Sequence, residues 1–409
     1  MRLRQLLNVS SWRKFAKVVA LNARMVLDRM RGRRVLILDL EEAMLLPFVE
    51  PVVRELLGKT RRISYYATFK TECPKIPGLD LSAGRTFDFT WARHMVAAHM
   101  FLSPHIWGRV PERVLRVHLP HGHPVKFACL PKVNFEHFNI HFVTGPLHRE
   151  QTEFTIHHYG LTEDIRIFDV GLPKSDKLMG GAFDRPSVLR GLRLDPAKPT
   201  VIYAPSWESG LSLRAFREML FDQFARMDGF NVIIKLHPAS CAQPGHPDYQ
   251  LYTGGTNWME FVGRYLAHPH IRNVVTDEID PLLAASDVMV SDISGVALEF
   301  LTLLKPVVYL DCPEFFIKTL PTLYKDFGAN TADYIKNDPK SNAGRHVGFL
   351  LEDVSALRDA VRFVLDHPEY KLAERKEYAA RIRYNAGCAA AAAADTILDL
   401  LKLPPAAKC

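Results

Sequence analysis

The stretch of residues 287–311, DVMVSDISGVALEFLTLLKPVVYLD, constrains the fold of this 409-residue chain more than any other. It contains an apolar run at 288–290, a polar Ser/Gly turn, an apolar segment at 296–304 and a second apolar run at 307–310. This order predicts a strand, a helix and a second strand, a βαβ unit that requires a parallel sheet covered on both faces. The turn would join a strand end to the amino end of a helix, where backbone N–H groups favour a phosphate.

The same alternation of apolar runs and helix-like segments extends over most of the chain. Runs that predict strands stand at residues 35–38, 63–69, 97–103, 114–119, 140–144 and 165–170 and, in a second series, at 201–204, 232–236, 274–276, 288–290 and 307–310. The polar, turn-rich segment 179–198 separates the two series and is expected to be a linker. The sequence therefore predicts an α/β protein with two doubly wound, Rossmann-like domains that face a central cleft.

These features divide the chain into four expected parts. A basic segment of residues 1–34 precedes a first Rossmann-like domain at 35–180. A second Rossmann-like domain is expected at 199–370 and C-terminal helices at 371–409. Within the last part, six consecutive alanines at 389–394 predict a tightly packed helix, because alanine is the strongest helix former.

Positive charge is concentrated at the start of the chain. Residues 1–34 contain ten Lys or Arg and one Asp, a net +9, whereas the whole chain carries +7 and the remainder therefore −2. The segment also carries Trp12, Phe15 and several leucines and valines at helix-like spacing. A basic amphipathic helix of this kind suits an anionic membrane surface; the alternatives are a docking helix with a solvated basic face and a partner-binding arm. Because the charge is confined to one arm and no nucleic-acid motif follows, we expect no nucleic-acid partner.

Two further features bear on the compartment. No apolar run approaches the roughly 18–20 residues that span a bilayer. The six cysteines include no CxxC pair, which is typical of thiols in a reducing cytoplasm. We therefore expect a cytoplasmic protein without a membrane-spanning helix.

Four short motifs follow predicted strands and therefore point to one cleft between the two domains. They are HGHPVK at 121–126, APSWES at 204–209, KLHP at 235–238 and SDISGVALEF at 291–300. In type and order they resemble the motifs of the CDP-glycerol glycerophosphotransferase family of teichoic-acid and capsule synthesis. That family carries an HGTPLK type, a YAPTWR type, a lone His-Pro after a strand and an SDYSS type. The resemblance covers about residues 114–311 and implies a GT-B-like fold.

Two departures from the family pattern stand out. His123 stands where the family has Thr, and Gly295 stands where it has a second Ser. In this respect the SDISGVALE segment resembles the DSGG-type turn of UDP-N-acetylglucosamine 2-epimerase, another GT-B-like enzyme. These departures bear on the donor and the acceptor more than on the fold.

Two histidines are the candidate catalytic residues. His121 has a side chain whose ordinary pKa suits removal of the proton from an attacking acceptor hydroxyl. His237, in the second domain, would stabilise charge on the pyrophosphate as the nucleotide leaves. For each, the alternative is a structural role, with His121 bonded to loop backbone and His237 buried.

Residues in the same motifs are expected to hold the phosphates and the nucleotide. Ser294 and Gly295, with the N–H groups that follow, would cradle a phosphate, unless Ser294 is an ordinary N-cap. Asp292 would orient this turn or a histidine rather than touch an anionic ligand, and Ser206 would line the nucleotide side. Glu299 resembles the acidic position that accepts a ribose hydroxyl pair in GT-B enzymes; the alternative is a helix residue paired with a base.

The remaining candidates belong to the first domain. Lys126 is expected to be a cation for the donor phosphates or the acceptor, or else a surface lysine after a turn. His123 would bind phosphate, replace His121 as the base, or be solvated. A zinc site made from His118, His121 and His123 lacks a convincing partner set. We expect no metal ion and no cofactor.

The resemblance implies a transferase that moves glycerol phosphate, or a related polyol phosphate, from a CDP-activated donor to a lipid-linked or polymeric acceptor, with CMP leaving. The first domain would then serve the acceptor and the second domain the donor nucleotide. The basic helix would hold the enzyme peripherally on the inner face of the cell membrane. One alternative is a GT-B glycosyltransferase that uses a nucleotide sugar, or an enzyme like UDP-N-acetylglucosamine 2-epimerase. Another is an inactive, membrane-bound scaffold paralogue.

Overall fold

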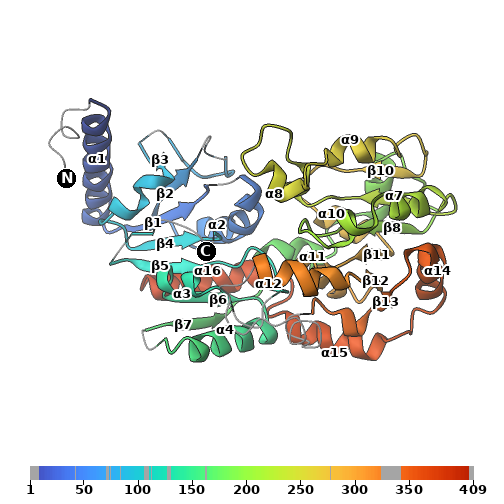
Figure 1. Ribbon diagram of the computed structural model, residues 1–409. Helices are drawn as coiled ribbons and strands as arrows, with labels where there is room; N and C mark the ends of the chain where they lie inside the picture. Colours follow the sequence, from blue (N-terminus) through green and yellow to red (C-terminus); the bar gives the residue numbers. More distant parts are fainter. Residues whose placement is uncertain are drawn as a thin grey trace.

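Two parallel β-sheets lie side by side and are flanked by helices (Figure 1). The structure is a computed structural model that describes residues 9–41, 43–70, 73, 75–82, 84–105, 110–111, 113–126, 130–161, 164–276, 278–323 and 342–404. The predicted α/β architecture with two doubly wound domains is confirmed.

The first sheet has seven strands in the order β3-β2-β1-β4-β5-β6-β7, and all neighbouring pairs are parallel. Its strands are β1 (Arg34–Asp39), β2 (Ile63–Phe69), β3 (Thr86–Asp88), β4 (Met100–Ser103), β5 (Leu115–His118), β6 (Ile140–Val143) and β7 (Arg166–Asp169). Strand β1 is apolar and buried at residues 35–38, as expected for a parallel sheet covered on both faces. The edge strand β3 has no counterpart among the predicted strands, because three residues carry too little periodicity.

The second sheet has six strands in the order β10-β9-β8-β11-β12-β13, and these pairs are also parallel. Its strands are β8 (Thr200–Tyr203), β9 (Asn231–Ile234), β10 (Ile271–Asn273), β11 (Val288–Ser291), β12 (Val307–Leu310) and β13 (Phe349–Leu351). The βαβ unit predicted at 287–311 is present as β11, the helix α11 (Gly295–Leu301) and β12.

One predicted strand of the second series is wrong. The β-branched residues at 274–276 predict a strand, but β10 lies just before them, where Ile271 pairs with Val232 of β9. The N–H of Val274 still bonds to Ile234, at 2.9 Å. The next residue, Val275, is exposed, so its apolar side chain does not belong to the core that covers the sheet.

Helices cover both sheets and connect their strands. In chain order they are α1 (Val9–Met30), α2 (Leu46–Lys59), α3 (Lys132–His137), α4 (Pro146–His158), α5 (Asp176–Met179), α6 (Arg185–Gly191), α7 (Ser212–Ala225), α8 (Tyr249–Thr253), α9 (Trp258–Gly263), α10 (Asp280–Ala285), α11, α12 (Leu320–Leu323), α14 (Leu357–Asp366), α15 (Leu372–Ile382) and α16 (Ala389–Leu400). Helix α6 lies inside the segment 179–198, which is therefore partly helical rather than a pure linker.

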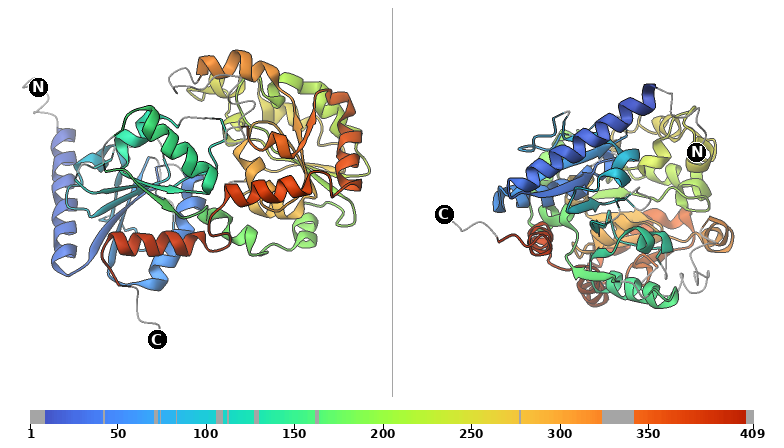
Figure 2. Two further views of the ribbon diagram at one scale, coloured as in Figure 1. Left: turned by 90° about the horizontal axis from the view of Figure 1, so that it is seen from below. Right: turned by 90° about the vertical axis from the view of Figure 1, so that its left-hand side faces the viewer.

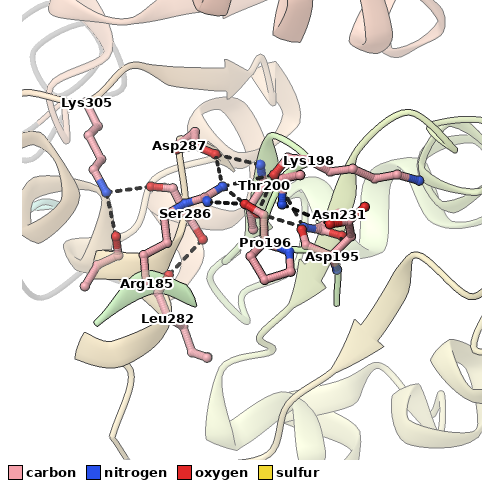
Figure 3. Close-up of polar contacts among 12 residues, drawn as sticks. Arg185, Asp195, Pro196, Lys198, Thr200, Asn231, Leu282, Ser286, Asp287 and Lys305 are labelled. Carbon is pink, nitrogen blue, oxygen red and sulfur yellow. Dashed lines mark hydrogen bonds and ion pairs between the residues drawn. The ribbon is translucent and has the colours of Figure 1, made fainter. Parts of the chain in front are cut away.

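A polar network anchors this segment at the amino ends of the second sheet (Figure 3). Arg185 of α6 donates to Asp287 at 2.9 Å, and the same carboxylate accepts the N–H of Thr200 at 2.8 Å. Lys305 donates to the carbonyl of Ser286 at 2.6 Å. These contacts fix the amino ends of β8 and β11. In a parallel α/β sheet a binding site forms at the opposite, carboxyl ends of the strands.

Helix α16 returns from the second sheet to the first. Figure 2 shows it lying along the first domain, and it packs against α2. The alanine-rich face that the sequence predicts to be tightly packed includes Ala393 and Ala394, which are fully buried. Ile397 and Leu398 join the same hydrophobic core as Leu36 of β1.

Helix α1 stands at the edge of the first domain (Figure 1) and has two different apolar faces. On one face Leu21 and Met25 are buried in the domain, and Asp28 accepts a hydrogen bond from the hydroxyl of Tyr66 at 2.9 Å. The other face exposes large apolar side chains, namely Trp12, Phe15, Val19, Val26, Leu27 and Met30. In the part of the chain that the structure describes, no helix is both long and apolar enough to cross a membrane.

Candidate active site

The four motifs meet where the carboxyl ends of the two sheets face each other. The loop 121–126 follows β5, the segment 204–209 follows β8, and His237 lies three residues beyond β9. The turn between β11 and α11 completes the set. Parallel strands bring their carboxyl ends to one edge of a sheet, so segments distant in sequence become neighbours there.

His121 is held by a backbone carbonyl. Its Nδ1 lies 2.6 Å from the carbonyl oxygen of Pro104, and its ring lies edge-on to Phe48 at 6.3 Å between centroids. A carbonyl oxygen only accepts hydrogen bonds, so Nδ1 carries the proton in the neutral ring. Nε2 of His121 is then the nitrogen that can take a proton from a substrate.

Asp39 organises the segment that holds His121. At the carboxyl end of β1, its carboxylate accepts hydrogen bonds from Thr68 of β2 at 2.8 Å and from Ser103 of β4 at 2.7 Å. Ser103 directly precedes Pro104, whose carbonyl fixes the His121 ring. Asp39 lies outside the four motifs; the signal that could have identified it is a polar side chain near the end of each of three adjacent strands.

His237 has the opposite arrangement of its ring nitrogens. Its Nδ1 accepts the backbone N–H of Ala239 at 3.2 Å, so the proton of the neutral ring is on Nε2. Burial, together with the charges of Lys126, Lys235 and His121, lowers the pKa of His237 to about 4, although Glu208 acts in the opposite direction. His237 is therefore neutral near pH 7 and presents an N–H donor.

The ring of His123 is directed into the first domain. It is buried, and its Nδ1 lies 3.0 Å from the hydroxyl of Thr144. Burial lowers its pKa to about 3, with a contribution from the charge of Lys174. Its main-chain carbonyl faces the second domain instead: a Cβ on Gly295 would lie 3.1 Å from this oxygen.

Lys126 crosses from the first domain to the second. Its ammonium donates to the hydroxyl of Ser206 at 2.7 Å and forms a close ion pair with Glu208. The Ser206 hydroxyl in turn donates to the second carboxylate oxygen of Glu208 at 2.6 Å. Lys126 and Ser206 are both predicted site residues, whereas Glu208, which joins them, has no predicted role.

Asp292 orients the loop that follows β8. One carboxylate oxygen accepts the N–H of Ser206 at 2.9 Å, and the other accepts the N–H and hydroxyl of Ser212 at 3.0 and 2.6 Å. Burial raises the pKa of Asp292, although these hydrogen bonds act in the opposite direction. These hydrogen bonds reach the loop after β8, whereas the sequence predicts that Asp292 orients its own turn or a histidine.

Ser294 and Gly295 form the amino end of α11. Ser294 is buried in an extended backbone conformation and makes no side-chain capping hydrogen bond to the helix. Its carbonyl accepts the N–H of Ala297 at 3.1 Å. The N–H of Ala297 is thus engaged. The N–H groups at the very start of a helix have no carbonyl four residues earlier in the helix, which is the property that favours a phosphate.

Glu299 is engaged in a buried ion pair between the domains. Its carboxylate lies 2.5 Å from the ammonium of Lys174, which also lies 3.1 Å from Asp280. Burial lowers the pKa of Lys174, but the two carboxylates outweigh burial and hold it above its ordinary value. A ribose at Glu299 would therefore share this carboxylate with Lys174.

A cavity of about 470 Å³ adjoins the Lys174 cluster and is lined by residues from both domains. Its walls come from α2, from the segment around Lys174, from the start of α10 and from the start of α16. Lys174 lies 5.6 Å from the ring centroid of Phe48, the residue that also contacts His121. The volume is in the range of small-ligand sites.

The described residues offer no support for the zinc alternative. Among them, no three His, Cys, Asp or Glu side chains are arranged to hold a metal ion. His121 and His123 direct Nδ1 to Pro104 and Thr144, while His118 lies beside the ring of Phe138.

Two Rossmann-like domains that bring the four motifs together at their strand ends define a GT-B-like fold. In fold the chain is similar to the wall teichoic acid polymerase TagF, with a TM-score of 0.63 and 14% identity over 97% of this chain and 99% of that one. It is also similar to UDP-GlcNAc 2-epimerase from Neisseria meningitidis, with a TM-score of 0.53 and 11% identity over 90% and 99%. These similarities confirm the predicted GT-B-like fold.

Residues 141–329 match the family model described as CDP-Glycerol:Poly(glycerophosphate) glycerophosphotransferase. This match confirms the resemblance carried by the motifs and the predicted enzyme class, a transferase like the CDP-glycerol glycerophosphotransferases. Three of the four motifs lie inside the matched segment, whereas 121–126 precedes it. No curated protein matches the chain in sequence.

Proposed function

We propose that this protein transfers glycerol phosphate, or a related polyol phosphate, from a CDP-activated donor to a surface-polymer acceptor and releases CMP. The observation that carries this proposal is the pair of histidines from opposite domains. His121 presents a proton-accepting Nε2, and His237 presents an Nε2–H donor. The family description names a glycerophosphotransferase, and TagF has been solved as a histidine variant soaked with CDPG.

In the proposed reaction an acceptor hydroxyl attacks the phosphorus that bears the glycerol. Nε2 of His121 removes the hydroxyl proton as the new P–O bond forms. The P–O bond to the CMP phosphate breaks, and CMP departs with the bonding electron pair. The N–H of His237 then donates to an oxygen of the departing phosphate and stabilises its developing charge.

The second domain would hold the donor. The N–H groups at the start of α11, beside Ser294 and Gly295, would bind a phosphate oxygen. Ser206 and Lys126 would line the same phosphates, with Asp292 fixing the loop that carries Ser206. We assign the ribose hydroxyls to Glu299, and the polyol acceptor to the side of His121.

We further propose that α1 holds the enzyme on the inner face of the cell membrane, next to a lipid-linked acceptor. Its exposed face carries Trp12 and Phe15, which are 59% and 61% exposed. Basic residues flank them, and the first 34 residues carry a net +9. Apolar and basic side chains on one helix favour an anionic lipid surface.

Nucleotide release tests the proposal. The purified full chain is incubated with CDP-glycerol, CDP-ribitol or UDP-N-acetylglucosamine and a lipid extract, and CMP, UDP and epimerised sugar are measured. We expect CMP release that falls at least 100-fold in His121→Ala and His237→Ala, but not in the control His367→Ala, whose side chain is exposed.

Other outcomes identify the rival functions. UDP release would indicate a nucleotide-sugar transferase, and epimerised UDP-sugar would indicate an epimerase. The scaffold alternative gains if no nucleotide is released and if cells carrying His121→Ala and His237→Ala keep the wild-type phenotype.

A further inference from the structure

The ion pair between Lys126 and Glu208 occupies the centre of the candidate site. Glu208 is 1% exposed and the Lys126 side chain 12% exposed, although they come from different domains. Ser206 bridges them, since it accepts from the lysine at 2.7 Å and donates to the glutamate at 2.6 Å. The three groups contact one another in a triangle between the two domains.

A carboxylate is unexpected in a site that must bind phosphates. The charges of Glu208 and Lys126 both act on His237, and the charge of Lys126 also acts on Asp292, so the pair lies among the predicted site residues. Buried ion pairs contribute little net stability compared with apolar residues of similar size, because desolvation offsets their attraction. Stability alone therefore gives no reason for this pair.

The triangle has two effects on Lys126. An ammonium has three N–H donors, and in this structure Ser206 and Glu208 take two of them. The direction of the third N–H is thereby restricted. The negative charge of Glu208 also offsets the positive charge that a phosphate would meet.

We propose that Glu208 is a positioning residue that orients the ammonium of Lys126 towards the phosphates of the nucleotide-activated substrate. Its negative charge also lowers the affinity of Lys126 for these phosphates. The substrate then binds in a fixed orientation, and the nucleotide product leaves without being retained by an unopposed lysine. This inference rests on the proposed function for the identity of the nucleotide, but the anion site itself does not depend on it.

The variant Glu208→Gln tests the charge of this residue with little change in shape. The amide can still bond to Ser206, but it no longer offsets Lys126. We expect inorganic diphosphate and CMP to bind about tenfold more tightly, because a unit charge near the ligand is removed. With CDP-glycerol, KM should fall and kcat should also fall, since product release becomes slower. A residue with a merely structural role would give a higher KM and a lower kcat.

Binding is measured by calorimetry on the full chain at low, fixed ionic strength, because salt screens the effect. The matched control is Glu136→Gln, which removes the carboxylate of a surface pair with Lys132 at 3.7 Å and should leave diphosphate affinity unchanged. If Glu208→Gln does not fold, Lys126→Met/Glu208→Gln removes both charges of the pair together. Diphosphate binding should then be lost; wild-type affinity in this double variant overturns the proposal.

The two proposals fail in different ways. If Glu208→Gln binds diphosphate more tightly than wild type while neither protein binds CMP or CDP-glycerol, the role of Glu208 holds and the donor is wrong. If CDP-glycerol is turned over but Glu208→Gln binds diphosphate no more tightly than wild type, the donor holds and Glu208 has no such role. Absence of diphosphate binding in Glu208→Gln also overturns the inference.

Discussion

The main-chain oxygen of His123 lies 3.1 Å from the place that a Cβ on Gly295 would occupy. The two residues belong to different domains, so the missing side chain of Gly295 allows the HGHP loop to touch the start of α11. In the sequence Gly295 stands out as a lost phosphate-binding hydroxyl. The structure adds a second reason for glycine, which is the close approach of the two halves of the site.

Gly295→Ala should therefore disturb both domains. His123 and the helix start must separate by a few tenths of an ångström, and overpacking of this kind costs about 1–3 kcal/mol. We expect a lower melting temperature and a lower kcat, measured by thermal unfolding and nucleotide release. The control is Gly58→Ala in α2, where an added Cβ meets nothing within 4 Å and should stabilise the helix slightly. Equal effects at both positions would contradict the close-contact explanation.

Acid should destabilise the first domain through its buried histidines. Burial lowers the pKa of His123 and His148 to about 3, that of His141 to about 4, and that of His118 well below its ordinary value. In the unfolded chain each has a pKa of about 6.5, so the unfolded state binds more protons below that pH. The free energy of unfolding therefore has its full value above about pH 6.5 and falls towards pH 4. At pH 5 each histidine that stays neutral in the folded protein lowers the free energy of unfolding by about 2 kcal/mol.

Thermal or urea unfolding between pH 4.5 and 8 checks this expectation. His118→Leu is the informative variant, because its buried Nε2 has no hydrogen-bond partner among the described residues. The variant should take up about one proton fewer on unfolding, so that its free energy of unfolding changes less steeply with pH. An unchanged slope would mean that His118 is not neutral in the folded protein.

The ion cluster around Lys174 should be more important for stability than surface pairs. Lys174→Ala leaves the carboxylates of Asp280 and Glu299 buried without their cation, which should cost about 3–5 kcal/mol. Glu299→Gln should cost less, because Lys174 keeps Asp280, and it should raise KM for the donor if Glu299 also binds the ribose. Urea unfolding and donor kinetics measure the two effects. Lys59→Ala, in a pair with the exposed Asp395, is the control and should cost at most about 1 kcal/mol.

Membrane binding should depend on the exposed face of α1. Deleting residues 1–34 is a poor test, because it also removes Leu21 and Met25 from the core of the first domain. Trp12→Ser/Phe15→Ser should instead abolish co-sedimentation with anionic vesicles and leave the melting temperature unchanged. Met219→Ser, at an exposed position in the second domain, should have no effect. Vesicle binding that survives the double substitution would remove α1 as the anchor.

The sequence predicts much of the fold because its apolar runs coincide with the strands. The unit at 287–311 appears as β11, α11 and β12, and the motifs mark the strand ends where the domains face each other. The edge strands β3 and β13 and the position of β10 escape prediction. Short, partly exposed strands have no periodic apolar signal that distinguishes them from neighbouring loops.

The candidate site is less predictable, because its contacts depend on how the domains dock. Lys126 and Glu208 are 82 residues apart, and Lys174 and Glu299 are 125 residues apart. Local patterns cannot pair such residues. The ring orientation of His121 likewise depends on Pro104, 17 residues away on another strand end.

The return of α16 to the first domain has a consequence for synthesis on the ribosome. The strands of the first sheet are complete at Asp169, but the core that includes Leu36 is also built from Ile397 and Leu398. At about 5–20 residues per second, the segment between Asp169 and α16 takes some tens of seconds to be translated. The second domain can therefore finish folding before the first. During that interval the apolar side chains that pack against α16, Leu36 among their core, lack part of their cover.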